Sequence, residues 1–343
     1  MMTTRKILYF TAPKQVEIRE ETLPALGDEE VLVETICSAI SAGTEMLIYR
    51  GQFPKIKDKY DSVSSKLKYP LAYGYACVGV IKETGKQVDK SLKNKLVFAF
   101  QPHSSSFIVS TSLSLHPSSL ILIPDFISPA TACLLPNVET AVNLVQDAAP
   151  ILGERVLVLG QGIVGLLTTA LLSEFPLDKL VTADLYELRR KASKDLNIII
   201  SLDSQSESKS KDYHGYTQDK FDLTFELSGS PTALNNAVQS TTFSGRVVIG
   251  SWYGEKRAPI DLGGDFHRSR IKLISSQVST IAPELSGRWD KSRRFEVAWK
   301  ALERIKPEKW ITHRFALSDA AKAYQLLDEH PEETIQVIFN YQN

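Results

Sequence analysis

Short apolar runs separated by turn residues dominate the first third of the chain. Glycine, proline, asparagine and serine interrupt these runs, which is typical of strands in a compact β-rich domain. The runs lie at residues 31–40, 76–81, 96–100, 107–110 and 120–124, and residues 1–20 read as one strand entering a second. We therefore predict a mostly β, barrel-like segment over residues 1–125.

One stretch of this segment, residues 54–69, is polar and rich in lysine. We interpret it as a solvated surface loop, with a flap over a cleft as the alternative.

The pattern changes near Ser128. Ser128 and Pro129 fit the N-cap and first position of a helix, and apolar residues then recur at helical spacing as far as residue 148. Apolar strands alternate with amphipathic helices after that. The predicted strands are 155–160, 179–184, 197–202, 221–229, 246–254 and 271–280, and the predicted helices are 165–175, 186–196 and 231–241. This alternation indicates an α/β fold, with a doubly wound parallel sheet over residues 126–281 that binds a nucleotide.

The remaining segment, residues 282–343, is too small to fold as a domain alone. It contains helical patterns at 291–305 and 318–328 and strand patterns at 311–317 and 334–341. We expect it to return to the N-terminal segment and complete that domain.

The strongest local motif is Gly160-Gln161-Gly162-Ile163-Val164-Gly165, between a predicted strand and a predicted helix. The glycines permit a tight turn, close approach of the backbone to a pyrophosphate, and close packing of helix on strand. The helix N-terminus then offers free amides to the phosphates. This context predicts a dinucleotide site.

Asp184 ends the next predicted strand, 19 residues after Gly165. A carboxylate there accepts hydrogen bonds from the adenosine ribose and repels a 2′-phosphate, so we expect NAD(H) to be preferred, with NADP(H) as the alternative. Arg189 and Arg190 lie close enough in sequence to meet a phosphate, although we place them on the exposed face of the following helix. Asp184 could instead cap that helix.

Two further turns follow predicted strands of the same sheet. They contain Ser228, Gly229 and Ser230, and Ser251, Trp252, Tyr253 and Gly254. Ligands bind at the carboxyl edge of such sheets, so these residues are candidates to bracket the nicotinamide. An ordinary strand-to-helix turn is the equally simple alternative.

Composition narrows the function classes. The chain has 343 residues, 43% of them hydrophobic and 23% charged, which suits two globular domains. Forty basic and forty acidic side chains cancel, so charge gives no case for nucleic acid or an anionic membrane surface. We see no membrane span and no signal peptide. Three scattered cysteines, Cys37, Cys77 and Cys133, favour a reducing, cytoplasmic setting over a disulfide framework.

The order of these parts resembles the medium-chain dehydrogenase/reductase superfamily, the alcohol dehydrogenase-like enzymes. The stretches 40–51, 69–81, 155–167 and 221–230 carry the resemblance. Residues 41–45 (SAGTE) are most similar to bacteriochlorophyllide-type and sorbitol/threonine-type dehydrogenases. The resemblance implies a GroES-like catalytic domain, an inserted Rossmann domain, and a homodimer or homotetramer paired through the strand at 271–280.

The same resemblance implies that the catalytic zinc has been lost. Zinc members carry a cysteine where this chain has Ala42, a histidine where it has Tyr75, and a glutamate or cysteine where it has Pro136. A catalytic zinc needs three protein ligands, and these side chains do not supply them. The structural zinc site of four cysteines is missing too.

Other groups must then polarise the substrate oxygen. Thr44 holds the position of the relay hydroxyl in relatives, so it is the first candidate. The Tyr75 phenol is a candidate donor or a filler of the site. His103 is a candidate acid/base, and Glu45 could orient the nicotinamide ribose or pack beside the cofactor domain. Arg288, Arg293 and Arg294 could bind an acidic substrate, but we expect them on a solvated helix surface.

We therefore expect hydride transfer between a nicotinamide and a small-molecule alcohol or carbonyl, with Thr44 and Tyr75 in place of the metal. One alternative is reduction of an activated C=C bond, as in quinone reductase-like and enoyl reductase-like members that also lack zinc. The other is a nucleotide-binding protein without catalysis.

Overall fold

The computed structural model of the protein describes residues 4–54, 67–111, 120–196, 198, 200–203 and 220–341. The lysine-rich stretch predicted as a surface loop lies mostly outside the described residues. The chain divides into two compact units, one of Met1–Pro136 with Leu302–Asn343 and the other of Asn137–Ala301. The boundaries expected from the sequence, after residues 125 and 281, come earlier than these. Helices α3 (Leu135–Ala148) and α9 (Lys291–Ile305) each run across one of these unit boundaries.

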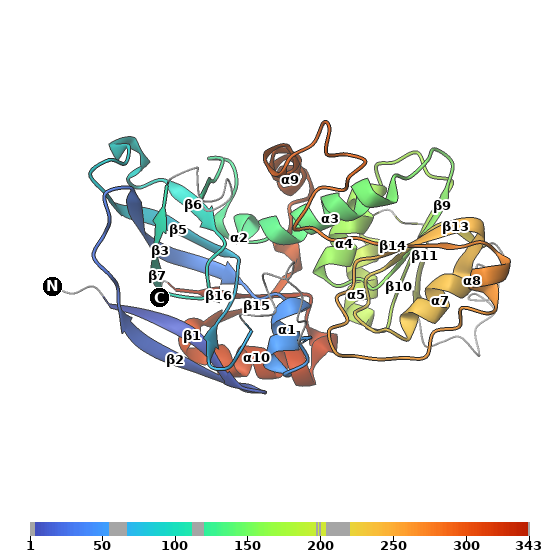
Figure 1. Ribbon diagram of the computed structural model, residues 1–343, viewed down its shortest axis with the longest axis horizontal. Coiled ribbons are helices and arrows are strands. Elements are labelled where there is room, and N and C mark those ends of the chain that lie inside the picture. The colour runs from blue at the N-terminus through green and yellow to red at the C-terminus, as the bar shows by residue number, and fades with distance from the viewer. Residues whose placement is uncertain are drawn as a thin grey trace. The chain divides into compact units, whose positions relative to one another are not determined.

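The first unit is built on a sheet with the strand order β15-β16-β3-β5-β6-β8, and β7 also pairs with β3 (Figure 1). Its strands are β3 (Glu30–Ala39), β5 (Cys77–Thr84), β6 (Leu96–Ala99), β7 (Ser106–Ser110), β8 (Ile121–Leu122), β15 (Ile311–Ala316) and β16 (Gln336–Asn340). Strand β16 pairs antiparallel with β3, so the C-terminal segment enters the sheet of the N-terminal segment.

A second, three-stranded sheet of this unit has the order β2-β1-β4. Its strands are β1 (Thr4–Ala12), β2 (Gln15–Thr22) and β4 (Leu71–Ala72). Helices α1 (Thr44–Tyr49) and α10 (Ala320–Glu329) share a core with it, in which the ring of Tyr324 meets that of Phe10 edge-on at 5.2 Å. The remaining helical turns are α2 (Pro129–Ala132), η2 (Lys90–Leu92), η3 (Pro307–Trp310), η4 (Leu317–Asp319) and η5 (Pro331–Glu333).

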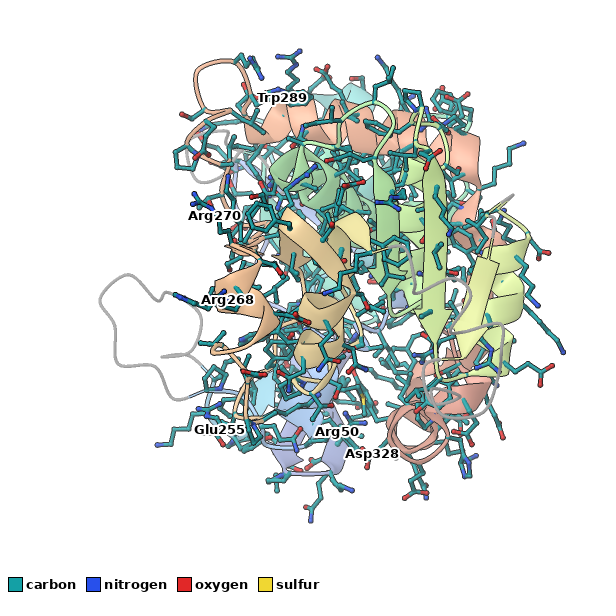
Figure 2. The ribbon with its side chains drawn as sticks, turned by 90° about the vertical axis from the view of Figure 1, so that its right-hand side faces the viewer. Arg50, Glu255, Arg268, Arg270, Trp289 and Asp328 are labelled. Atoms are coloured by element: carbon teal, nitrogen blue, oxygen red, sulfur yellow. The ribbon has the colours of Figure 1, made fainter. Side chains whose placement is uncertain are left out.

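An ion pair joins α1 to α10 at the edge of this core. The Arg50 guanidinium donates to Asp328 at 2.6 Å (Figure 2). Lys14 lies 2.8 Å from the same carboxylate. Burial by itself would raise the pKa of Asp328, but the hydrogen bonds from Lys14 and Arg50 outweigh it and leave the pKa lowered. The carboxylate therefore stays ionised and keeps the two helices together.

The second unit holds a six-stranded parallel sheet with the order β11-β10-β9-β12-β13-β14 (Figure 1). Its strands are β9 (Arg155–Leu159), β10 (Lys179–Asp184), β11 (Ile200–Asp203), β12 (Phe221–Glu226), β13 (Thr241–Ile249) and β14 (Lys272–Ser275). Its helices besides α3 are α4 (Ile163–Leu172), α5 (Glu187–Lys194), α7 (Ala233–Ser240) and α8 (Asp265–Arg268). In chain order the strands run 3-2-1-4-5-6, which is the doubly wound Rossmann order. The predicted fold class is confirmed.

The helix expected from residue 128 to 148 is instead two helices, α2 and α3. Ser128 does cap α2, accepting a hydrogen bond from the Thr131 amide at 3.1 Å. Proline lacks an N–H and its ring clashes with the carbonyl four residues earlier. Pro136 therefore cannot continue α2 and lies in the first turn of α3.

The strand expected over 271–280 is confined to β14 (Lys272–Ser275). Its partner β13 ends at Ile249, opposite Ser275, so residues 276–280 have no strand to pair with in this sheet. Arg294 of α9, expected on a solvated surface, is instead fully buried. It lies 2.9 Å from the Glu139 carboxylate and donates to the carbonyls of Val278 and Thr280.

The three cysteines are buried free thiols, and burial raises the pKa of Cys77 well above its usual range. Among the described residues, no helix is long and apolar enough to cross a membrane.

Candidate functional site

The glycine motif forms the turn between β9 and α4, and each glycine has a different surrounding. Gly160 has φ +93°, and a Cβ there would lie 2.6 Å from the Leu227 carbonyl. A Cβ on Gly165 would lie 1.9 Å from the Gly160 oxygen, so the helix packs against the turn itself. Gly162 is different, because a Cβ there would meet nothing within 4 Å. The middle glycine thus leaves the backbone open to a ligand, while the outer two are required by the protein.

Asp184 is tied directly to this turn. Its carboxylate accepts hydrogen bonds from the amides of Gln161 at 2.6 Å and Tyr186 at 2.8 Å, and it is nearly buried at the end of β10. A carboxylate can accept about four hydrogen bonds, so two positions remain for a ribose diol. The Gln161 side chain is buried and bonds within the turn, to the Gly160 carbonyl and the Thr169 hydroxyl. Ile163 and Val164 form the first turn of α4.

The two arginines that follow Asp184 are half-buried on α5. The Arg189 guanidinium lies over the Tyr186 ring, 4.8 Å from its centre. Arg190 donates to the carbonyls of Asp184 at 3.0 Å and Leu185 at 2.6 Å. Both side chains therefore pack against the loop rather than extending along the exposed face of the helix.

The turns after β12 and β13 are joined to each other. The Gly229 amide donates to the Ser251 hydroxyl at 2.9 Å. A Cβ on Gly160 would also lie 2.7 Å from the Ser228 Cα, which places this pair of turns against the glycine motif. Trp252 is 40% exposed beside them. The structure thus gathers the predicted cofactor residues at the carboxyl ends of β9, β10, β12 and β13.

A buried carboxylate that the sequence analysis missed fixes these turns. Glu226 is fully buried at the end of β12. Its carboxylate accepts hydrogen bonds from the Ser228 amide at 2.9 Å, from the Ser228 hydroxyl, and from the Tyr253 phenol at 2.5 Å. Burial and the adjacent Glu226 charge raise the pKa of Tyr253 well above its usual range, so the phenol remains a donor. Glu226 lies in an almost continuous apolar strand, where period-two patterning does not single it out.

The first unit brings three hydroxyl groups together at the turn before α1. The Tyr75 phenol donates to the Ser41 hydroxyl at 2.5 Å, and the Thr44 amide donates to the same oxygen at 3.2 Å. Burial raises the pKa of Tyr75, and hydrogen bonds with the Ser41 and Thr44 side chains offset part of that rise. Thr44 and Tyr75 were predicted from the sequence; Ser41 was not, since a lone serine in a turn carries no signal.

Glu45 and His103 lie behind this turn, and both are fully buried. The Glu45 carboxylate accepts three hydrogen bonds. They come from the Ser41 amide at 2.9 Å, from His103 Nε2 at 2.9 Å and from the Tyr324 phenol at 2.5 Å. The other nitrogen of His103 bonds to the Ser38 hydroxyl at 2.7 Å. Both ring nitrogens and both carboxylate oxygens are therefore used within the unit, which supports a positioning role.

The residues at the three expected zinc-ligand positions do not fit a zinc ion. Ala42 is exposed in the turn with no donor atom, the Tyr75 phenol bonds to Ser41, and Pro136 lies in α3. Across the described ranges, the group of metal-ligating side chains close enough to share an ion is His330, Glu332 and Glu333. All three are exposed, at η5 rather than at the hydroxyl turn.

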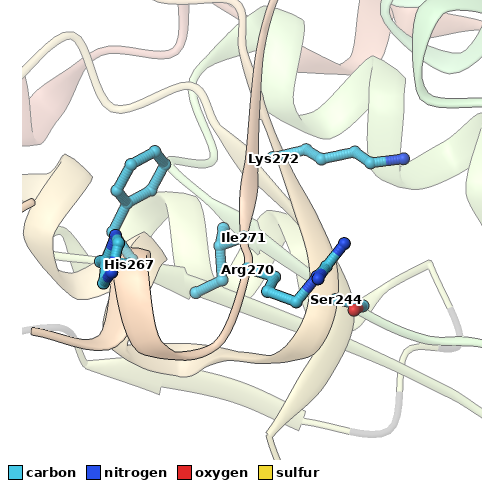
Figure 3. Close-up of a pocket in the computed structure, with 6 residues that line it drawn as sticks. Ser244, His267, Arg270, Ile271 and Lys272 are labelled. Carbon is cyan, nitrogen blue, oxygen red and sulfur yellow. The ribbon is translucent and has the colours of Figure 1, made fainter.

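A shallow hollow lies elsewhere on the second unit, at the amino end of β14 (Figure 3). Its lining residues are Ser244, Phe266, His267, Arg270, Ile271 and Lys272. None of the predicted cofactor residues lines it, and ligands of such sheets bind at the opposite edge.

Known proteins resemble this chain along nearly its whole length, although no family model matches it. D-guloside 3-dehydrogenase of Escherichia coli (strain K12) is 22% identical over 350 residues, which covers 97% of this chain and 99% of the relative. Sorbitol dehydrogenase 1 of Saccharomyces cerevisiae is 23% identical over 358 residues, covering 94% of each.

Solved structures show the same fold. The apo form of zinc-dependent alcohol dehydrogenase 2 from Streptococcus pneumonia has a TM-score of 0.79 at 19% identity and covers 99% of both chains. An alcohol dehydrogenase of Escherichia coli CFT073 in complex with NADH has a TM-score of 0.75 at 20% identity, covering 98% of this chain and 99% of that one. These likenesses, together with the strand order and the glycine turn, agree with the resemblance seen in the sequence. Similarity to these dehydrogenases over nearly the whole chain supports an alcohol dehydrogenase-like member of the medium-chain dehydrogenase/reductase superfamily and an NAD(P)-dependent oxidoreductase.

Proposed function

We propose that the protein is a zinc-independent, NAD(H)-preferring dehydrogenase that interconverts a secondary alcohol and a ketone in a small polyhydroxylated molecule. The curated relatives include guloside, sorbitol and L-galactonate dehydrogenases, which supports this substrate class. The oxygen-polarising groups are side-chain hydroxyls of the first unit.

The second unit holds the cofactor. The open backbone at Gly162 and the N-terminus of α4 receive the pyrophosphate, and Asp184 accepts the adenosine ribose hydroxyls. Glu226 keeps Ser228, Gly229 and Ser251 in place for the nicotinamide end. When bound, the nicotinamide supplies or accepts the hydride. The Asp184 carboxylate disfavours a 2′-phosphate by like charge and supports the preference for NAD(H).

The first unit supplies the hydrogen bonds to the substrate oxygen. Hydrogen bonds that strengthen as charge develops on that oxygen lower the barrier, and positioned donors commonly contribute about 10²- to 10³-fold. The raised pKa of Tyr75 keeps its phenol protonated at neutral pH. Glu45 and His103 hold the turn that presents Ser41 and Thr44.

The observation that carries the proposal is the hydroxyl group cluster of Ser41, Thr44 and Tyr75. Of the expected ligand positions, Ala42 offers no donor atom and the Tyr75 phenol bonds to Ser41, so the side chains here support hydrogen bonding to a substrate oxygen rather than zinc binding.

The proposal is tested on one protein preparation. Metal content is measured by elemental analysis, and reduction of NAD and NADP is followed at 340 nm with sorbitol, L-threonine and L-galactonate, with and without EDTA. We expect less than a tenth of an equivalent of zinc, turnover insensitive to EDTA, and a lower Kd for NADH than for NADPH. Stoichiometric zinc whose removal abolishes turnover would refute zinc independence, and tighter NADPH binding would refute the role of Asp184.

We also propose that the protein forms a homodimer or homotetramer through β14, in the cytoplasm. Strand β14 is the edge of the six-stranded sheet, and edge strands commonly pair across a two-fold axis. Light scattering of the purified protein measures this, and a monomeric mass would rule it out.

A further inference from the structure

Ser41 differs from the other two hydroxyls of the turn in how its hydrogen bonds are used. A serine hydroxyl has two acceptor positions and one donor. The Tyr75 phenol and the Thr44 amide fill the acceptor positions. Among the described residues, no group accepts the Ser41 proton. The Ser41 hydroxyl proton therefore has no acceptor among the described residues of this unit and is available to a ligand.

The surroundings of Ser41 are open. Ser41 is half-buried, and the two residues after it, Ala42 and Gly43, are exposed. A Cβ on Gly43 would meet no atom within 4 Å. A small molecule can therefore reach the Ser41 hydroxyl. The Tyr75 phenol proton is already donated to Ser41 and is not free for the substrate.

The bond from Tyr75 also changes the strength of the Ser41 donor. A hydroxyl that accepts a hydrogen bond becomes a better donor, because successive bonds polarise one another. Glu45 holds the Ser41 backbone amide at 2.9 Å, and His103 and Tyr324 hold Glu45, so the turn is fixed from behind. The Ser41 hydroxyl is therefore a donor that is polarised by Tyr75 and held in position through Glu45.

We propose that Ser41 is the group that donates directly to the substrate oxygen, and that Tyr75 is a positioning residue acting through it. The inference rests on the proposed dehydrogenase function and reverses the expected order, in which Tyr75 contacts the substrate.

In the direction of carbonyl reduction, protons move from Tyr75 through Ser41 to the substrate oxygen. As the carbonyl oxygen gains negative charge, the Ser41 O–H bond breaks and an O–H bond of the product alcohol forms. Ser41 takes the proton of Tyr75 along the existing 2.5 Å hydrogen bond. The Tyr75 phenolate, stabilised by the Thr44 hydroxyl, then takes up from solvent the one H⁺ that the overall reduction of a carbonyl by a reduced nicotinamide consumes. Oxidation of the alcohol runs the same steps in reverse.

The kinetic test compares Ser41→Ala, Ser41→Thr, Tyr75→Phe and the double variant Ser41→Ala/Tyr75→Phe. We expect S41A to lower kcat by about 10²-fold or more and S41T, which restores a hydroxyl, to stay within about tenfold of the native enzyme. Y75F should cost about tenfold. The double variant should match S41A within about twofold, since residues acting in series are not additive. A Y75F loss equal to that of S41A, or an additive double variant, overturns the assignment.

A second measurement does not depend on turnover. The tyrosinate absorbance assigned to Tyr75, as the difference between native protein and Y75F, is titrated with base in native protein and in S41A. Because the Ser41 hydrogen bond lowers the pKa of Tyr75, that pKa should rise in S41A. An unchanged titration would remove the hydrogen bond on which the inference depends.

The outcomes separate the two proposals. If native protein turns over no alcohol or carbonyl, the proposed function is wrong and the relay falls with it. If turnover is normal and S41A retains it, with melting temperatures equal within about 2 °C, the dehydrogenase stands and the Ser41 assignment alone is wrong.

Discussion

At the scale of single residues, the glycine turn separates what the fold requires from what a ligand requires. Gly165 touches the Gly160 carbonyl so closely that no other residue fits, whereas Gly162 faces open space and has a φ of −65°, which any residue can adopt. The two positions therefore form a matched pair for substitution.

Gly165→Ala should lower stability and Gly162→Ala should lower cofactor affinity. The Cβ of G165A would lie 1.9 Å from backbone, so helix and turn must shift, at a cost of about 2–4 kcal/mol in the free energy of unfolding. G162A has room in the free protein and should keep its melting temperature within about 2 °C. Its methyl group should obstruct the pyrophosphate and raise the Kd for NADH at least about tenfold.

Urea denaturation and fluorescence titration with NADH measure the two effects. A stable G165A, or a G162A with native NADH affinity, would contradict the division of roles.

The glycine motif was predictable because its chemistry resides in the backbone and leaves a fixed spacing in the sequence. Thr44 and Tyr75 were predictable because the resemblance places them at known positions. Ser41 and Glu226 were not, since their roles depend on partners 34 and 27 residues away, Tyr75 and Tyr253. A single sequence records residue types but does not record such pairings.

At the scale of secondary structure elements, α9 shows how a charged residue can belong to a core. Phe295, Ala298, Leu302 and Ile305 form its buried face, and Arg294 lies on the same side. Its guanidinium bonds to Glu139 of α3 and to carbonyls after β14. The helical spacing of the apolar residues already places Arg294 on the buried face of α9. The sequence-based prediction was wrong because arginine is usually exposed.

Arg294→Leu should destabilise the second unit strongly. The substitution leaves Lys291 as the remaining cation beside the buried Glu139, and the carbonyls of Val278 and Thr280 lose the hydrogen bonds from Arg294. We therefore expect a loss of about 3–5 kcal/mol in the free energy of unfolding. Arg294→Lys should recover only part of this, because one ammonium cannot replace the guanidinium fork.

The neighbouring Arg293 provides the control. It is exposed and lies over the Trp289 ring, 4.1 Å from its centre, so Arg293→Ala should cost no more than about 1 kcal/mol. Urea denaturation of the three variants decides the matter, and equal losses for R294L and R293A would count against a structural role for the buried arginine.

Most elements of the chain were predictable from hydrophobic periodicity, and α9 and β10 match their expected limits. The misplaced ones have local causes. Pro136 divides one helix into α2 and α3, and β14 ends at Ser275 because its partner β13 ends at Ile249. Periodicity reports which face of a segment is buried, but it does not report where the neighbouring strand ends.

At the scale of the whole molecule, buried phenols make stability depend on pH in the alkaline range. Burial raises the pKa of Tyr75, Tyr253, Tyr324 and Tyr341 above the usual value, and the charges of Glu45 or Glu226 add to the rise. Below pH of about 10 both the folded and unfolded chains keep these protons. Above it the unfolded chain releases them while the folded chain retains them.

Stability should therefore fall as pH rises above about 10. The folded state then binds more protons than the unfolded state, so the free energy of unfolding declines by about 1.4 kcal/mol per pH unit for each retained proton. Calorimetric melting temperatures between pH 7 and 11 should stay level at first and then drop steeply. Tyr253→Phe, which removes one of these protons, should start from a lower melting temperature because Glu226 loses a hydrogen bond, and should then decline less steeply. Parallel alkaline slopes for the native protein and Y253F would show that this phenol ionises as readily in the folded protein as in the unfolded chain.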